Sequence, residues 1–422
     1  YRYQILKNHI LSMFAKEQNW MVRKELIVAA GKMKLIEATP LLKGVLESDQ
    51  ATFEEKGLAT KALLQIEQQL TSTEITHLAA SPKAALRAFA CAAALQLKDK
   101  KHQEVIFALV KDPRPDVRIA AIYTIARGYL TTTDKERLSV IFRSLLQDTD
   151  ADVAITAAWA LAFLQPQQAI EELERWVSSD SPLHRKVAAA AIAATGEVGQ
   201  DLAQKILKIS FDPFVKVNLA MGLIGQRYQL QQAADAIYRF AVNKEELIMY
   251  QRYKNTPFSV VMPSNVPYLD HIPNYPTVVD QMAQLKILSY LAIIQAPRAK
   301  DVLQKFLKTK SWGIASFASI LLMRESGEDS LNCIRDLLQS EHATIKLQAA
   351  LILALFGKDE RVATILQEAY AKEHHEYKKA ILEALGQIGT PATAKFLMIG
   401  LEEPFQILQI SAASAILRCL KK

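Results

Sequence analysis

The sequence predicts an all-α fold: a right-handed α–α superhelix of about twelve helical-hairpin repeats with one non-repeat insertion. Two observations predict this fold. A phrase of the form Asp-Pro-x-x-x-Val-Arg-x-x-Ala-Ala, clearest at residues 112–121, recurs mostly at intervals of 31 to 36 residues. Of the 422 residues, 50% are hydrophobic, which is enough to cover the packed faces of every helix pair. A period of this size is typical of repeat arrays, in which each unit packs on the next.

Each copy of the phrase predicts a turn followed by a helix. Pro113 and Pro115 cannot extend a preceding helix, and Asp112 or Asp116 can cap the next one by accepting its exposed backbone N–H groups. Apolar residues recur at helical spacing from Val117 onward. A second helix then completes a unit of this length, which leaves no room for a third.

The repeat phase divides the chain. With Val117 as reference, the equivalent positions are Val22, Glu55, Leu86, Val153, Arg185 and Val217, then Val279, Trp312, Ile345, Tyr377 and Leu408. The 62 residues between Val217 and Val279 are one repeat plus about thirty more. We therefore expect N-terminal repeats over residues 1–243, an insertion over 244–277 and C-terminal repeats over 278–422, all in one continuous solenoid.

The repeated phrase resembles the short HEAT-like repeats of the HEAT/ARM class, of the type found in phycobilisome lyase subunits. Tetratricopeptide units keep a stricter period and a different Trp/Gly/Tyr phrase, which is absent here. The resemblance covers nearly the whole chain and says little about function, because a solenoid hosts many activities. It implies that the second helices line the inner face. It also implies a structural ladder of ion pairs between the basic residues of the repeats, such as Arg118, and the aspartates of adjoining turns. These aspartates would be Asp112, Asp148, Asp180 and Asp212.

The net charge of +7 raises the question of nucleic acid as a partner. The ladder would make much of the basic character structural, and no block of five or more like charges occurs. The second helices around Arg175 and Arg239 carry acidic residues as well, such as Glu171 and Asp235, so the predicted inner face is mixed in sign. A nucleic-acid groove should be a basic stripe with little acid. Nucleic acid therefore stays possible but is not favoured.

Cysteines and hydropathy favour a cytoplasmic location. Cys91, Cys333 and Cys419 lie far apart in apolar helical sequence without a CxxC motif, so neither a disulfide framework nor a zinc site is indicated. No run approaches the roughly eighteen apolar residues of a membrane span. The chain starts with Tyr1 rather than Met, so an upstream targeting segment stays open.

No set of residues predicts catalysis, a metal or a cofactor. The eight histidines show no metal-ligand spacing, and the cluster His374-His375-Glu376 reads as a solvated turn. The HEAT-like di-iron hydroxylases use several His-Glu pairs, whereas this chain has one. Asp270 and His271 are adjacent in an extended segment, so their side chains should point to opposite sides. We expect a protein that is not an enzyme.

The insertion is the best candidate site. Five prolines forbid regular helix over residues 255–277, while residues 244–253 should continue as helix. The insertion is unusually apolar for a loop, so its surface should be covered, either as a plug in the groove or by a partner. The predicted partner-binding residues are Phe258, Met262, Tyr268, Leu269, Tyr275, Trp176, Arg175 and Arg239.

The main functional hypothesis is a non-catalytic scaffold or adaptor that binds a protein partner along the concave face. A nucleic-acid or anionic-surface binding protein is the alternative, and an enzyme that resembles the bilin lyases is a third. The last helix, over residues 404–420, has no helix after it. Its apolar edge, with Ile410, Leu417 and Leu420, should be sealed by more chain, by a partner or by self-association.

Overall fold

The structure of the protein is a computed structural model. It describes residues 2–48, 50–66, 72–97, 102–130, 134–254, 256–265, 275–296, 298–309, 311–323 and 327–420. These residues form two compact units: Tyr1–Tyr228 with Tyr250–Met262 (unit 1), and Gln229–Met249 with Pro263–Lys422 (unit 2).

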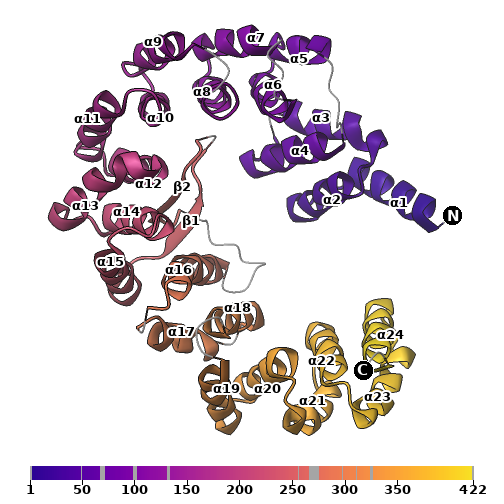
Figure 1. Cartoon of the computed structure of the whole chain (residues 1–422). Helices are drawn as coiled ribbons and strands as arrows, with labels where there is room; N and C mark the ends of the chain where they lie inside the picture. The colour runs from indigo at the N-terminus through magenta and orange to yellow at the C-terminus, as the bar shows by residue number, and fades with distance from the viewer. Residues whose placement is uncertain are drawn as a thin grey trace. The chain divides into compact units, whose positions relative to one another are not determined.

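Unit 1 is built from helix pairs followed by part of a β-hairpin (Figure 1). Its helices are α1 (Arg2–Lys16), α2 (Trp20–Lys32), η1 (Ile36–Ala38), α3 (Thr39–Glu47), α4 (Phe53–Ile66), α5 (Ser72–Ala79), α6 (Ala84–Leu97), α7 (Gln103–Ala108), η3 (Leu109–Lys111), α8 (Pro115–Gly128), α9 (Lys135–Leu145), α10 (Ala151–Leu161), α11 (Pro166–Val177), α12 (Pro182–Ala194), η4 (Gly196–Gly199), α13 (Gln200–Ile209) and α14 (Pro213–Gly225).

Unit 2 continues in the same manner. Its helices are α15 (Leu230–Asn243), α16 (Tyr275–Ile293), α17 (Ala299–Leu307), α18 (Trp312–Met323), α19 (Gly327–Asp336), η5 (Leu337–Gln339), α20 (Ala343–Gly357), η6 (Glu360–Val362), α21 (Ala363–Tyr370), α22 (His375–Ile388), α23 (Pro391–Leu397), η7 (Met398–Glu402) and α24 (Gln406–Leu420). In both units the first helix of each repeat packs on the first helix of the next, as α10 does on α8 and α12 and as α22 does on α20 and α24. The predicted all-α solenoid is confirmed.

Aspartate and serine start many of these helices, as the repeated phrase predicts. The side chains of Asp134, Asp150, Ser181 and Asp212 accept backbone N–H groups at the starts of α9, α10, α12 and α14. In α8 the cap residue is Arg114, without a side-chain cap, and the Asp112 carboxylate instead accepts the N–H of Arg114 (2.9 Å).

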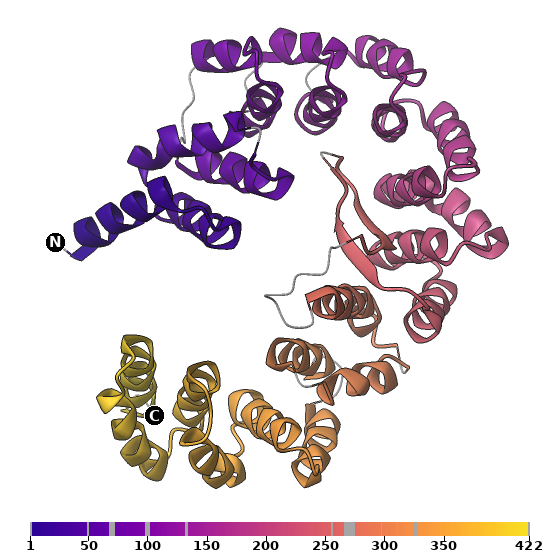
Figure 2. The same ribbon diagram turned by 180° about the vertical axis from the view of Figure 1, so that it is seen from behind.

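The inner face of unit 1 is formed by first helices, so the expectation that second helices line it is wrong. Helices α8, α10, α12 and α14, here called the inner row, lie on the side of the hairpin, and α9, α11 and α13 lie on the other side (Figures 1 and 2). The different burial of first and second helices explains why the first helices lie on the side of the hairpin. Residues 152–161 of α10 are all buried, whereas α11 buries one stripe, Ala169, Leu173 and Val177. Only a helix covered from both sides can bury every face.

The insertion contains strands where helix was expected. Strands β1 (Ile248–Arg252) and β2 (Ser259–Pro263) form a two-stranded sheet, and Tyr253 N–H donates to Phe258 O (2.9 Å) beside the turn. Helix does not continue over residues 244–253 because buried Asp280 holds this segment extended. Its Oδ1 accepts from Lys244 Nζ (2.7 Å) and from the N–H of Ile248 (2.9 Å).

The apolar character of the helices is that of packed repeats. Among the described residues, no helix has both the length and the hydropathy needed to cross a lipid bilayer. Cys91 is buried, Cys333 and Cys419 are half-buried, and all three are free thiols.

Candidate functional site

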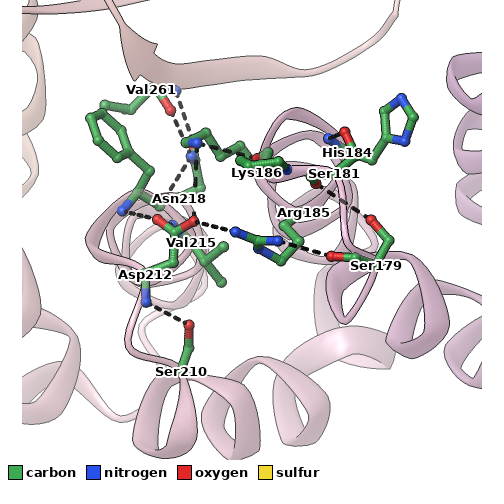
Figure 3. A network of polar contacts seen from close by, with 12 residues as sticks. Ser179, Ser181, His184, Arg185, Lys186, Ser210, Asp212, Val215, Asn218 and Val261 are labelled. Carbon is green, nitrogen blue, oxygen red and sulfur yellow. Dashed lines mark hydrogen bonds and ion pairs between the residues drawn. The ribbon is translucent and has the colours of Figure 1, made fainter.

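The hairpin is attached to α14 by one buried amide. The Asn218 side chain, 2% exposed, accepts from Val261 N–H at Oδ1 (2.9 Å) and donates from Nδ2 to Val261 O (3.0 Å). Its Nδ2 also donates to Phe214 O within α14 (2.8 Å). Figure 3 shows the amide lying against the edge of β2. The Asn218 side chain thus pairs with the backbone N–H and C=O of Val261 in the way that a neighbouring strand would.

Aromatic rings attach the hairpin to α10. Phe258, 2% exposed, packs edge-on against Trp159, with ring centroids 5.8 Å apart. Trp159 also packs edge-on against Phe163 (5.3 Å) and stacks on Tyr123 of α8 (6.2 Å). Its Nε1 donates to Ala194 O at the end of α12 (3.1 Å). Phe258 is therefore part of the core of unit 1.

An ion pair attaches the hairpin turn to the start of α10. Lys254 Nζ pairs with Oδ2 of Asp152, a residue that is 4% exposed. Burial alone lowers the pKa of Lys254, but the bond to the Asp152 carboxylate more than offsets this and raises the pKa to about 12. Burial and the Asp152 charge raise the pKa of the neighbouring Tyr253. Lys254 has a φ of 46°, a left-handed conformation that is rare for residues other than glycine.

A cation–π contact attaches the hairpin to α8. The Arg252 guanidinium lies 5.5 Å from the ring centroid of Tyr123, and its Nε donates to Thr256 O across the turn (2.8 Å). Three helices of the inner row, α8, α10 and α14, thus contact the hairpin with different chemistries.

Two well-formed pairs join basic residues to the aspartates of the next turn. Arg87 donates to both Asp112 oxygens (2.6 and 2.8 Å), and Arg118 donates to Asp148 (2.7 Å). Burial alone raises the pKa of Asp112, but the bonds from Arg87 and from the N–H of Arg114 lower it overall. These cations are thereby occupied inside the repeat stack.

The pairing weakens beyond α10. Arg185 approaches Asp212 at 3.7 Å, and it contacts Asp180 only through the Asp180 carbonyl (3.1 Å). Arg185 matches Arg118 rather than Val117, because both arginines donate to the carbonyls five and six residues before them. The repeat phase assigned to Arg185 was therefore one residue off. The matching position in α10 is Ala154, which has no charge to form a pair.

The remaining predicted site residues are not brought together. Met262 is half-buried in β2, Tyr275 is the first residue of α16, and Tyr268 and Leu269 lie outside the described residues. Trp176 and Arg175 lie on α11, away from the hairpin, where Trp176 packs edge-on against His184 (5.6 Å) and Arg175 pairs with Glu172. Arg239 is exposed on α15 in unit 2.

Several residues that hold the hairpin were absent from the predicted site, among them Asn218, Asp152, Trp159 and Lys254. A signal existed for two of them. Asn218 and Asp152 are polar residues within the otherwise apolar or alanine-rich sequence of first helices. A buried polar side chain needs a partner, so each pointed to a contact that the repeat alone does not supply.

Two further expectations from the sequence concern a metal site and the exposed edge of the last helix. Among the described ranges, no group of three or more His, Cys, Asp or Glu side chains is arranged to hold a metal ion. The apolar edge of α24 is exposed at Ile407, Ile410, Leu417 and Leu420. Self-association through this edge stays a prediction.

A comparison with protein families finds the repeats in part of the chain. The family model for HEAT repeats matches residues 138–223, within unit 1, and residues 334–416, within unit 2. These two stretches are HEAT repeats. A comparison with curated proteins finds no match.

Several solved structures are similar at low identity. A homology model of the full-length AP-3 complex in an intermediate open conformation is 12% identical, with a TM-score of 0.34, over 98% of this chain and 90% of that chain. The karyopherin Kap121p bound to the extreme C-terminus of the protein phosphatase Cdc14p is 13% identical, with a TM-score of 0.38, over 99% of this chain and 54% of that chain. Human deoxyhypusine hydroxylase in complex with glycerol is 17% identical, with a TM-score of 0.24, over 76% of this chain and 97% of that chain. The chain spans about half the length of the Kap121p chains that it matches.

Proposed function

We propose that this chain is a non-catalytic scaffold or adaptor that binds a protein partner along the inner row of unit 1, with the hairpin as a fixed contact element. The observation that carries this proposal is the Asn218 amide, which binds both backbone groups of Val261. A HEAT-repeat helix in this row thus already holds an extended segment of polypeptide.

The attachment of the hairpin uses the chemistry of peptide recognition. Backbone groups are bound by a side chain, an aromatic anchor fills an apolar site, and a buried carboxylate takes up a lysine. Protein surfaces that bind extended peptides combine contacts of these kinds. The buried Phe258, Val260 and Val261 support the role of a plug, while Arg252 and Ser259 remain exposed beside the row for a partner.

Site-specific photo-crosslinking tests this proposal. A photoreactive residue at Ser259, which is exposed on β2, should crosslink the partner in cells. The same residue at Glu171, exposed on α11 away from the hairpin, should not. The crosslinked protein, identified by mass spectrometry, should bind the purified full chain. Equal crosslinking from both positions would contradict a partner site on the inner row.

A second experiment tests the hairpin itself. Residues 250–262 are replaced by a Gly/Ser linker of equal length in the full chain. We expect exposure of the apolar inner row, lower solubility and loss of the partner. Unchanged melting, solubility and partner recovery would refute the role of the hairpin. Nucleic-acid binding that weakens steeply with salt would favour the alternative function instead.

A further inference from the structure

Charged side chains link the starts of neighbouring first helices in unit 1. Arg87 of α6 donates to Asp112 before α8, and Arg118 of α8 donates to Asp148 before α10. Arg118 is the fourth residue after the cap of its helix, and Asp148 lies two residues before the cap of the next. The two arginine side chains are only 12% and 11% exposed, so solvent ions screen these pairs less than exposed pairs.

This link is missing between α10 and α12. Counted from the helix caps, the residue of α10 that matches Arg118 is Ala154. The residue before α12 that matches Asp148 is Ser179. Neither side chain carries a charge, so the ion pair of the preceding repeats cannot form here.

A charged link is present again between α12 and α14. Arg185 and Lys186 of α12 approach the carboxylate of Asp212, the cap of α14, at 3.7 and 4.0 Å. Lys186 Nζ also lies 5.1 Å from the ring centroid of Phe214. Figure 3 shows Arg185 directed at Asp212. Of the first helices described from α6 to α14, only α10 and α12 are neighbours without a charged link at their starts.

The other polar contacts between these two repeats lie elsewhere. Trp159 Nε1 donates to Ala194 O at the far ends of α10 and α12 (3.1 Å). On the outer helices, Lys205 of α13 pairs with Glu174 of α11 (2.6 Å), but both side chains are largely exposed. Exposed ion pairs contribute little to stability. The starts of α10 and α12 therefore have no comparable restraint of their own.

The hairpin spans this gap. Lys254 pairs with Asp152, two residues after the cap of α10, and Val261 is bound by Asn218, six residues after the cap of α14. In a repeat array each repeat contacts only its neighbours, whereas the hairpin connects α10 to α14 past α12. Because α14 is linked back to α12 through Asp212, these contacts close a loop around the unlinked starts.

We propose that the hairpin is a conformational strap that replaces the missing charged link and fixes the repeat of α10 and α11 against the repeat of α12 and α13. Detaching the strap at either end frees this step of unit 1 while the linked steps keep their geometry. A ligand that displaced the hairpin would therefore loosen unit 1 at one defined place.

Distance measurements by pulsed electron paramagnetic resonance on the full chain test the proposal. Spin labels replace the exposed Glu171 of α11 and Lys208 of α13, which lie on either side of the unlinked step. A control pair replaces Lys135 of α9 and Glu171, across the step that Arg118 links. The half-buried thiols of Cys333 and Cys419 are changed to serine, so that labels attach only at the introduced positions.

Two variants detach the strap at opposite ends. Lys254→Met removes the ion pair to α10, and Asn218→Ala removes the attachment to α14 without altering any residue of α10 or α12. Each should broaden and shift the α11–α13 distance distribution and leave the α9–α11 distribution unchanged. The matched control Lys205→Met removes a lysine ion pair across the same step, but an exposed one, and should change neither distribution.

A compensating ion pair gives a second test. Ala154→Arg with Ser179→Asp rebuilds, between α10 and α12, the link that joins α8 to α10. Added to Asn218→Ala, the two substitutions together should restore the narrow α11–α13 distribution, and neither alone should. If the arginine prevents folding at the buried position of Ala154, the two detaching variants decide the test.

Several results would overturn the inference. These are unchanged α11–α13 distances in both Lys254→Met and Asn218→Ala, equal changes in both label pairs, or an equally strong effect of Lys205→Met. A folded compensating variant that leaves the distribution broad would do the same. The labels report geometry and not binding, so this inference and the scaffold function can fail separately.

Discussion

At the scale of single residues, the attachment of the hairpin depends on buried polar side chains. Asn218 satisfies three backbone groups, and none of the three can reach water once the hairpin is in place. The energetic effect of such a group is asymmetric: a formed bond adds little net stability, whereas an unpaired buried partner costs much more.

We expect Asn218→Ala to destabilise unit 1 by about 2–4 kcal/mol, since it leaves the Val261 N–H and C=O without partners. Hydrogen exchange of the amides in β1 and β2 should accelerate accordingly. The control Asn243→Ala changes the same residue type at the exposed end of α15 and should leave this exchange unaltered. Native-like protection of the strands in Asn218→Ala would show that the amide is dispensable.

A second residue-scale prediction concerns acid. Arg361 donates to Asp359 (2.6 and 2.8 Å), and this bond, stronger than the opposing effect of burial, lowers the pKa of Asp359 from 3.8 to about 2. A carboxyl whose pKa is lower when folded adds stability above its unfolded pKa and loses it as the pH falls. Unit 2 should therefore lose roughly 1–2 kcal/mol between about pH 4 and pH 2, a value reduced for the exposure of Arg361.

The urea midpoint of unit 2, measured across this pH range, checks the prediction. Arg361→Met should flatten the loss of stability below about pH 4. Arg418→Met removes an equal charge from the exposed side of α24 and should preserve the pH dependence. An identical acid response in Arg361→Met and in the unaltered chain would exclude Asp359 as the source.

At the scale of elements, small residues set how closely neighbouring first helices approach. A Cβ added at Gly222 of α14 would lie 2.4 Å from the Cβ and 2.7 Å from the Cα of Ala193 in α12. The Cα belongs to a packed backbone, so it cannot move aside as the end of a long side chain could. In the same helix, a Cβ at Gly225 would meet no atom within 4 Å.

We expect Gly222→Ala to lower the free energy of unfolding of unit 1 by about 1–3 kcal/mol through overpacking. Gly225→Ala is the matched control, because it adds the same methyl group to the same helix. It should be neutral or stabilising by up to about 1 kcal/mol, owing to the higher helix propensity of alanine. Chemical denaturation followed by circular dichroism compares the two variants. Equal changes in the free energy of unfolding would indicate that helix propensity, and not packing, determines the effect of the added methyl group.

The repeat elements could be predicted from the sequence, because their signals are local. Proline, aspartate and helical spacing mark each helix start within a few residues. The hairpin could not be predicted in this way. Pro257 and Pro263 excluded helix but did not indicate which segments pair. The partners of β2 are a strand about ten residues away and Asn218, 43 residues earlier in the chain. The inner row was misassigned because the expectation was taken from the resemblance to HEAT-like repeats, and not from the extent of the apolar surface on each helix of this chain.

At the scale of the whole molecule, HEAT repeats occur in both units, and the contacts of the hairpin with α8, α10 and α14 lie within unit 1. In a repeat array each element depends mainly on its neighbours. The effect of removing a hairpin anchor should therefore remain local.

We expect Phe258→Ala to accelerate hydrogen exchange in α10 and α14 while α22 and α24 keep their protection, since loss of a buried ring costs about 3–5 kcal/mol. Phe211→Ala removes the same ring from a fully exposed position (100%) in unit 1 and should have no such effect. Faster exchange throughout both units would indicate a single cooperative body instead.

The amide of Asn218 has a consequence for the behaviour of the protein at high concentration. An unpaired strand edge is a template on which further copies of a chain can assemble into fibrils or amorphous aggregates. Because Asn218 occupies both groups that Val261 would offer outward, the β2 edge cannot recruit another molecule at that point. The same contact that fixes the hairpin therefore also acts as a guard against intermolecular β-assembly.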